Sequence, residues 1–191
     1  MSKILDLLFF RHCHTCPRWL CFTFDNWFRK RFQNPAEIVK DYIREGDRVL
    51  DVGPGIGFFT LPMAKMVGDR GLVIAVDIQE TMLTAIRKRA EQAGLQHRIK
   101  FQLGEISSPG IGGEVDFILA FWMVHEVSGK RVFFKELYSV LKDDGKFLMV
   151  EPKFHVAKKQ FDATVQTAAE VGFKIVAQPL ISGSIAVLFS K

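Results

Sequence analysis

The sequence of 191 residues lacks an apolar run long enough to cross a membrane. Its most apolar start, residues 1–10, contains Lys3 and Asp6 and ends at Arg11, whereas a spanning helix needs about 20 apolar residues. The start also lacks the basic region, the longer apolar run and the small-residue cleavage site of a secretory signal. We therefore expect a cytoplasmic protein without a membrane span.

Cysteine is scarce, and none follows Cys21. The three cysteines are an odd number, lie within nine residues of one another and follow no export signal. This pattern favours reduced thiols over a disulfide framework. Together with His12 and His14, Cys13 and Cys16 supply enough nitrogen and sulfur for a tetrahedral zinc site, but the spacing is irregular and a second ligand pair is missing. We expect no metal site and interpret the thiols as buried among aromatic side chains.

The sequence also has no internal repeat or low-complexity tract, and its positive charge is uneven. Residues 1–44 hold eight of the 26 basic and four of the 21 acidic residues, so most of the net charge of +5 belongs to this segment. This charge is dilute beside that of dedicated nucleic-acid binders, so nucleic acid is a disfavoured partner. The oligomeric state stays open.

Aromatic residues are concentrated at the same end of the chain. Eight lie in the first 32 positions: Phe9, Phe10, Trp19, Phe22, Phe24, Trp27, Phe28 and Phe32. We expect short helices over 2–10, 24–32 and, after Pro35, 36–42. We interpret residues 1–44 as a substrate-covering extension of a domain formed by residues 45–191, in which Trp19, Phe24 and Trp27 contact the substrate.

From Arg48 onward, short β-rich runs alternate with helical periods, which is typical of a doubly wound α/β sheet. Strands are predicted over 48–52, 72–77, 99–103, 115–121, 146–151, 173–177 and 184–189. Helices are predicted over 58–67, 81–93, 131–141 and 158–171, with a turn over 142–145. Only six residues, 178–183, join the last two strands, which is too few for a parallel crossover. We therefore expect a three-layer Rossmann-like sheet of seven strands, mostly parallel, with a C-terminal antiparallel hairpin.

The first predicted strand runs into a glycine-rich turn that contains Gly53, Gly55 and Gly57. Glycines at the carboxyl end of such a strand let a ligand approach the backbone closely. Dinucleotide enzymes place a glycine at the sixth position of this turn, where Phe58 stands here. Asp51 precedes the turn, and its carboxylate would repel a pyrophosphate but can accept hydrogen bonds from an amino-acid ammonium. These features disfavour a nicotinamide-dependent reductase, which stays as an alternative.

Asp77 ends the second predicted strand, where an acid is suited to hold the two hydroxyls of a ribose. Nucleoside cofactors of several kinds share this feature, and a solvated acid at a strand end would give the same pattern. Ile78, Gln79 and Met82 follow as candidate walls for an adenine ring, although ordinary packing at a helix start is the alternative.

Five segments taken in order resemble class I S-adenosylmethionine-dependent methyltransferases, especially the type 11 and ubiquinone-biosynthesis-like branch. They read VLDVGPGIG, VIAVDIQ, LGEI, VDFILAFWMVHEV and ELYSVLKDDGKFLMVEPK, and they span roughly residues 45–191. The resemblance implies S-adenosylmethionine as cofactor. It implies contacts to the methionine part from Asp51, Gly53, Gly55 and Gly57, to the ribose from Asp77, to the adenine edge from Glu105 and Ile106, and closure of the pocket by the backbone of Ala120 and Phe121. The chain departs from the family at Pro54, where Cys or Ala is common, and at Glu105, where Asp is commoner.

Methyl transfer from a sulfonium mainly requires alignment of the nucleophile, methyl and sulfur, with a base only for a protonated nucleophile. His125 and Glu126 follow the fourth predicted strand, where a base can reach the methyl, and Trp122 belongs to the same substrate-facing loop. A structural role for His125 and Glu126 is the alternative. The thiols could also bind a soft metalloid substrate, as in arsenite methyltransferases, which the catalytic half distantly resembles. That family needs cysteines distributed through the chain, and none follows Cys21 here, so we disfavour this substrate. We expect a small-molecule methyl acceptor, and a catalytically silent S-adenosylmethionine-binding protein is the other alternative.

Overall fold

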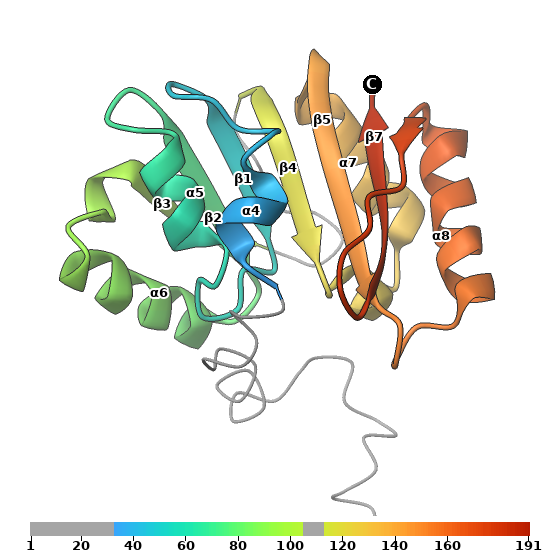
Figure 1. Cartoon of the computed structure of the whole chain (residues 1–191), viewed down its shortest axis with the longest axis horizontal. Helices are drawn as coiled ribbons and strands as arrows, with labels where there is room; N and C mark the ends of the chain where they lie inside the picture. Colours follow the sequence, from blue (N-terminus) through green and yellow to red (C-terminus); the bar gives the residue numbers. More distant parts are fainter. Residues whose placement is uncertain (1–32, 105–112) are drawn as a thin grey trace, which may run out of the picture.

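A computed structural model describes residues 33–104 and 113–191 of the chain (Figure 1). The helices expected over 2–10 and 24–32, the thiols, the candidate substrate residues Trp19, Phe24 and Trp27, and the candidate adenine residues Glu105 and Ile106 lie outside the described residues. All other candidate site residues are described.

The described residues form one seven-stranded sheet in the order β3-β2-β1-β4-β5-β7-β6. Strands β1 to β5 pair in parallel, whereas β7 runs antiparallel to both β5 and β6. The predicted sheet with its C-terminal hairpin is therefore confirmed. The strands are β1 (Arg48–Val52), β2 (Leu72–Asp77), β3 (Ile99–Leu103), β4 (Val115–Phe121), β5 (Leu141–Pro152), β6 (Lys174–Ala177) and β7 (Ser184–Ser190).

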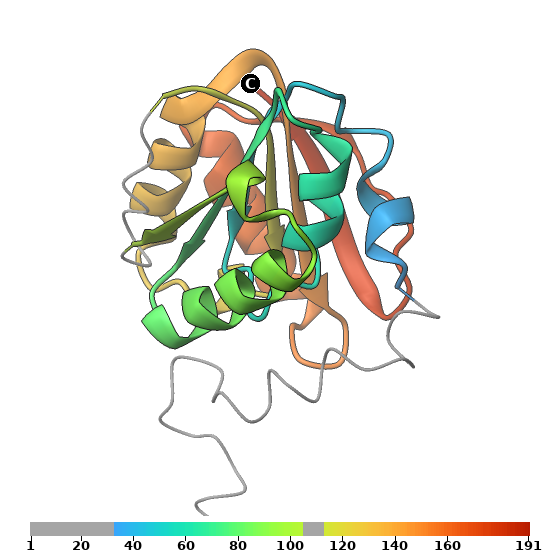
Figure 2. The same cartoon turned by 90° about the vertical axis from the view of Figure 1, so that its left-hand side faces the viewer.

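Helices cover both faces of this sheet, which gives three layers (Figures 1 and 2). Side chains alternate along each strand, so that Val49 of β1 packs in one apolar core and its neighbour Leu50 in the other. One core includes side chains of α4 (Pro35–Val39), α5 (Thr60–Met66) and α6 (Glu80–Gln92), and the other those of α7 (Lys130–Val140) and α8 (Lys158–Val171). Two short 3-10 helices, η1 (Gln96–Arg98) and η2 (Val124–Glu126), complete the described elements.

The turn predicted over residues 142–145 is wrong, because these residues belong to β5. The pairing jumps from Val115 with Leu141 to Phe117 with Lys146, so the extra residues form an irregularity within the strand. An ion pair between Lys142 and Asp116 joins the two strands there. Strand pairing thus continues to Leu141, five residues before the predicted start of the strand.

Smaller differences affect the ends of other elements. Helix α5 begins at Thr60 rather than at residue 58, since residues 55–59 complete the glycine-rich turn. Strand β6 begins at Lys174 because the N–H of the buried Phe173 still bonds to Ala168 O at the end of α8. Helix α4 ends at Val39 instead of residue 42.

Residues 33–44, which the sequence analysis assigns to the extension, pack against the main body. Val39 and Ile43 are buried in the core that includes α5. The Nε2 of Gln33 donates hydrogen bonds of 2.6 Å to Ser182 O and 3.3 Å to Ser184 Oγ, next to β7. This part of the chain therefore contributes to the folded core.

Candidate functional site

The site is built at the carboxyl edge of the parallel strands, the lower edge of the sheet in Figure 1. The turn after β1 is tied to β2 by a hydrogen bond of 2.9 Å from Gly53 N–H to Val76 O. A Cβ at Gly53 would lie 2.9 Å from Met123 Cγ, whereas a Cβ at Gly55 would have no described heavy atom within 4 Å. The turn is therefore packed against protein at Gly53 and open at Gly55.

Asp51 is buried beneath this turn, with only 2% of its surface exposed. Its Oδ2 accepts a hydrogen bond of 2.6 Å from Thr60 Oγ1. Burial raises the pKa of Asp51 to about 7, and the nearby charge of Asp77 adds to the rise, although the Thr60 hydrogen bond opposes it. A cation beside this carboxylate would favour its ionised form.

Asp77 lies at the tip of β2 and is also buried. Its Oδ1 accepts a hydrogen bond of 2.9 Å from Gln79 N–H. Burial raises its pKa to about 6, while the N–H groups of Gln79, Gly55 and Ile78 oppose the rise. The fold thus brings Asp77 next to the turn that contains Gly55, as the sequence analysis expects of a shared ligand site.

These two buried carboxylates fit the implied cofactor. Among the described residues, neither Asp51 nor Asp77 forms an ion pair with a lysine or arginine. A ligand that carries an ammonium and a ribose diol would supply the missing cation and the missing donors. The Gly55 N–H is one of the backbone groups that bond to Asp77, so the open side of the turn adjoins that carboxylate.

The candidate adenine walls differ in accessibility. Ile78 and Gln79 are half-buried and Gln79 lies at the start of α6, so both can face a ligand. The side chain of Met82 is 2% exposed and packs inside the protein. Ala120 is buried between β1 and β5, and Phe121 packs on Phe59 with ring centroids 4.4 Å apart.

Trp122 has an unusual backbone conformation just after β4, with φ of 59°. A bulky residue in the left-handed region costs roughly 1–3 kcal/mol and is typical of functional sites. Two hydrogen bonds hold it there, from its N–H to Val150 O at 2.7 Å and from its indole Nε1 to Ser184 Oγ at 3.0 Å. Its ring meets that of Phe154 edge to face at 5.5 Å, and Phe154 is 71% exposed.

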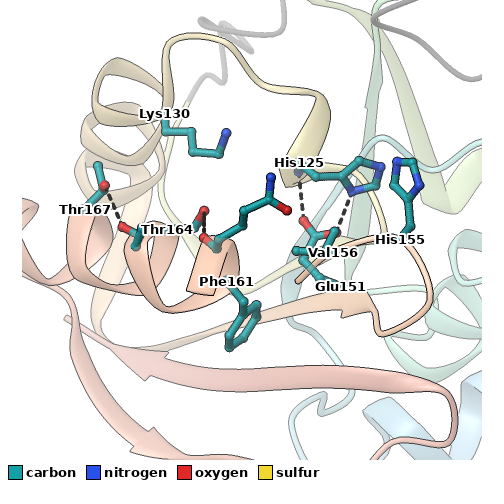
Figure 3. A pocket seen from close by; sticks show the side chains of 10 residues that line it. His125, Lys130, Glu151, His155, Val156, Phe161, Thr164 and Thr167 are labelled. Atoms are coloured by element: carbon teal, nitrogen blue, oxygen red, sulfur yellow. Dashed lines mark hydrogen bonds and ion pairs between the residues drawn. The ribbon is translucent and has the colours of Figure 1, made fainter. Parts of the chain in front are cut away.

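His125 lies in η2, three residues after Trp122, and contacts the end of β5 (Figure 3). Its N–H donates to Glu151 Oε1 at 2.9 Å, and its Nδ1 lies 2.6 Å from Glu151 Oε2. The other ring nitrogen, Nε2, lies 4.0 Å from Glu126 Oε1. Burial lowers the pKa of His125, but the hydrogen bond and charge of Glu151 and the charge of Glu126 outweigh burial and raise it above its ordinary value.

A pocket of about 520 Å³ opens beside His125, between the start of α7 and the first turns of α8 (Figure 3). Neither this pocket nor Glu151 was predicted from the sequence. The signal for Glu151 was available, because it is an acid at the carboxyl end of the apolar strand next to β4. The lining residues are His125, Lys130, Glu151, His155, Val156, Gln160, Phe161, Ala163, Thr164 and Thr167.

The described residues contain no group of three or more His, Cys, Asp or Glu side chains that could hold a metal ion. Within the same residues, no helix has both the length and the apolar character needed to cross a membrane.

A sequence model of the family described as "Methyltransferase domain" matches residues 43–181. This match covers well over half of the chain, so the chain belongs to the methyltransferase domain family. Membership confirms the predicted class, the S-adenosylmethionine-dependent methyltransferases, and with it the predicted cofactor. It also disfavours the nicotinamide-dependent reductase.

Two curated relatives carry more specific names. The chain is 34% identical over 115 residues to a demethylmenaquinone methyltransferase of Symbiobacterium thermophilum, which covers 60% of this chain and 46% of the relative. It is 30% identical over 136 residues to the ubiquinone/menaquinone biosynthesis C-methyltransferase UbiE of Shewanella frigidimarina, and this match covers 69% of this chain and 54% of the relative. The chain thus spans about half the length of these relatives.

Solved structures agree with the fold. An S-adenosylmethionine-dependent methyltransferase from Aquifex aeolicus superposes with a TM-score of 0.79 at 24% identity, over 92% of this chain and 98% of that chain. Fibrillarin from Aeropyrum pernix, solved with natively bound S-adenosyl-L-methionine, superposes with a TM-score of 0.64 at 18% identity, over 81% and 72%. At these identities the likeness concerns the fold alone.

Proposed function

We propose that this protein transfers the methyl group of S-adenosylmethionine to a small-molecule acceptor in the cytoplasm. The observation that carries the proposal is the pair of buried, neighbouring carboxylates of Asp51 and Asp77 at the turn that is open at Gly55. We assign Asp51 and the backbone of Gly53, Gly55 and Gly57 to the methionine part of the cofactor. Asp77 would bind the ribose, and Ile78 and Gln79 would contact the adenine.

We further propose a hydroxylated aromatic ring of the quinol type as the acceptor. Support comes from the two relatives whose names specify methylation in menaquinone or ubiquinone biosynthesis, one of them as a C-methyltransferase. The aromatic pair of Trp122 and Phe154 offers such a ring a flat apolar neighbour. We keep Trp19, Phe24 and Trp27 as candidate substrate residues of the extension.

When bound, S-adenosylmethionine supplies a methyl group on a sulfonium, which is already a good leaving group. The chain's own contribution is to align the acceptor atom with the methyl and to exclude water. Met123 packs on Gly53, so η2 begins directly beside the glycine turn. His125 and Glu126 are the candidate bases there, and we favour His125 because its Nε2 is the nitrogen that Glu151 leaves unoccupied.

The proposed function is tested by incubating the full chain with S-adenosylmethionine carrying a labelled methyl group and with naphthohydroquinone as acceptor. We expect S-adenosylhomocysteine and a ring-methylated product in equal amounts. Binding of S-adenosylhomocysteine without label transfer to this acceptor or to a cell extract would instead support the catalytically silent alternative.

A further inference from the structure

Both carboxylate oxygens of Glu151 contact His125. Glu151 lies at the end of β5, and only 2% of its surface is exposed. One oxygen accepts a hydrogen bond from the His125 backbone N–H, and the other contacts the imidazole Nδ1. A carboxylate can only accept hydrogen bonds, so this contact keeps a proton on Nδ1. One side chain therefore fixes the backbone, the ring orientation and the tautomer of His125, and Nε2 is left as the proton acceptor.

The groups around the imidazole come from every element packed against it. Glu151 belongs to β5, Glu126 to η2, Lys130 to α7 and His155 to the segment before α8. The His155 ring meets the His125 ring edge to face at 4.9 Å. Lys130 Nζ donates to Val127 O at 2.9 Å, and Glu126 is the nearest acid to Nε2. The negative charges of Glu151 and Glu126 thus outnumber the positive charge of Lys130.

The pocket beside this pair suits a compact, neutral ligand with hydroxyl groups. Its volume of about 520 Å³ lies in the range of small-molecule sites. Helix α8 contributes only uncharged groups to the lining, including the polar Gln160, Thr164 and Thr167 and the apolar ring of Phe161. The two threonine hydroxyls donate to carbonyls of their own helix, so their oxygens keep lone pairs that can accept from ligand hydroxyls.

We propose that this pocket is the acceptor site, that it takes an aromatic diol, and that Glu151 is the positioning residue that orients His125 as the base. This inference rests on the proposed function and adds the location of the acceptor and the role of Glu151. The exposed Phe154 directly precedes His155 of the lining, and its ring meets that of Trp122, which packs against the core that includes α4 to α6.

In the resulting step, Nε2 of His125 takes the proton of a ring hydroxyl. The electron pair released into the ring forms the new carbon–carbon bond to the methyl, while the methyl–sulfur bond breaks and sulfur keeps its electron pair. The methylated ring carbon then loses its hydrogen to water, and the ring oxygen takes the proton back from His125. One proton is released overall for each methyl transferred.

The test uses the full chain with carbon-13-labelled histidine, and the His125 signal is assigned with a His125→Gln variant. S-adenosylhomocysteine is added first, and its failure to bind would overturn the proposed function itself. Naphthohydroquinone is then titrated into the complex. We expect the His125 signal to shift with saturation, and an unmoved His125 signal would overturn the placement of the acceptor.

Two helix variants locate the pocket independently. Ala163 lines it, so Ala163→Phe should fill it and weaken naphthohydroquinone binding at least tenfold without changing the affinity for S-adenosylhomocysteine. Ala169→Phe is the matched control, because Ala169 is exposed on the same helix and is not among the lining residues. Equal diol affinity in both variants would contradict the proposal.

The positioning role is tested by Glu151→Gln, which preserves size but removes the charge. We expect the His125 signal of this variant to titrate at lower pH than in the wild type, kcat to fall at least tenfold and the affinity for S-adenosylhomocysteine to stay the same. Glu151→Asp, which restores the charge on a shorter side chain, should recover part of the shift. A His125 titration that is identical in wild type and Glu151→Gln would overturn the role of Glu151.

Discussion

Met123 occupies the space that a side chain on Gly53 would need, since a Cβ there would lie 2.9 Å from Met123 Cγ. Gly55 has a similar positive φ, +57° against +66°, but no described heavy atom lies within 4 Å of its own Cβ position. A side chain at Gly53 therefore collides with protein, whereas a side chain at Gly55 extends into the space proposed for the cofactor.

We predict that Gly55→Val abolishes binding of S-adenosylhomocysteine with only a modest loss of stability. A left-handed residue with a Cβ costs roughly 1–2 kcal/mol, which lowers the Tm of a chain of this size by a few degrees. Gly94→Val is the matched control, because Gly94 has φ of +68° and equally open surroundings after α6. Calorimetry should show normal binding for the control, and normal binding by Gly55→Val would refute the position of the cofactor.

The affinity for S-adenosylhomocysteine should rise with pH. The pKa values of Asp51 and Asp77, about 7 and about 6, mean that both carboxyls are largely protonated at pH 5.5 in the free protein. The ligand's ammonium favours ionised Asp51, so binding below these values releases protons. We expect roughly tenfold tighter binding per pH unit between pH 6 and 7 and little change above pH 8. Calorimetry across this range checks the slope, and a flat profile would contradict the assignment.

The raised pKa of Asp51 also determines whether this residue stabilises or destabilises the folded protein at a given pH. Its folded pKa is raised above 3.8, so its neutral form contributes stability that is complete at low pH and is lost as pH rises through about 7. Asp51→Asn should therefore raise the Tm of the ligand-free protein at pH 8 but not at pH 4, while it weakens ligand binding. Thermal melts at the two pH values measure this, and a lower Tm at pH 8 would oppose the assigned cause.

Trp122 is expected to serve the acceptor rather than the cofactor. Trp122→Asn removes the indole, while asparagine tolerates the left-handed backbone that Trp122 adopts. Loss of aromatic contact of about 0.5–1.5 kcal/mol should raise KM for naphthohydroquinone roughly three- to tenfold and leave the Kd for S-adenosylhomocysteine unchanged. An unchanged KM would remove Trp122 from the acceptor site.

A chain that begins at Gln33 should fold, bind S-adenosylhomocysteine and lose turnover on the acceptor. It retains α4 and the hydrogen bonds of Gln33 to Ser182 and Ser184. A chain that begins at Gly46 should be much less stable, because Val39 and Ile43 leave the core at a cost of about 3–6 kcal/mol. Thermal melts compare the two chains, and full turnover by the first would show that residues 1–32 do not cover the acceptor.

Local pattern was sufficient to predict much of the sheet. The bounds of β1 to β4 match the predicted ones residue for residue, because short apolar runs bounded by glycine or charged residues leave little freedom in placing a buried strand. The extension of β5 to Leu141 depends on pairing with β4 and on the ion pair between Lys142 and Asp116, which no local pattern contains.

The candidate site also combines residues that local pattern predicts with contacts that only the folded chain shows. Asp51, the glycines and Asp77 follow strands directly, so their meeting at one edge follows from parallel pairing. The contact between His125 and Glu151 joins residues 26 apart, and the pocket needs α8 in place beside η2. The pairing of β4 with β5 would have been enough to predict that His125 and Glu151 lie close together, but it would not have predicted the pocket.

Calorimetric titration of S-adenosylhomocysteine into the wild type, Asp77→Asn and Asp77→Ala tests the central claim, that these carboxylates hold the cofactor, most directly. Hydrogen bonds to a charged acceptor contribute about 1.5–3 kcal/mol. We therefore predict binding by the wild type and roughly ten- to hundredfold weaker binding by Asp77→Ala. Asp77→Asn, whose side-chain oxygen can still accept from Gln79 N–H, should melt no lower than the wild type, because burial raises the pKa of Asp77 to about 6, while it binds more weakly than the wild type. No heat of binding with the wild type, or one dissociation constant shared by all three proteins, would contradict the account.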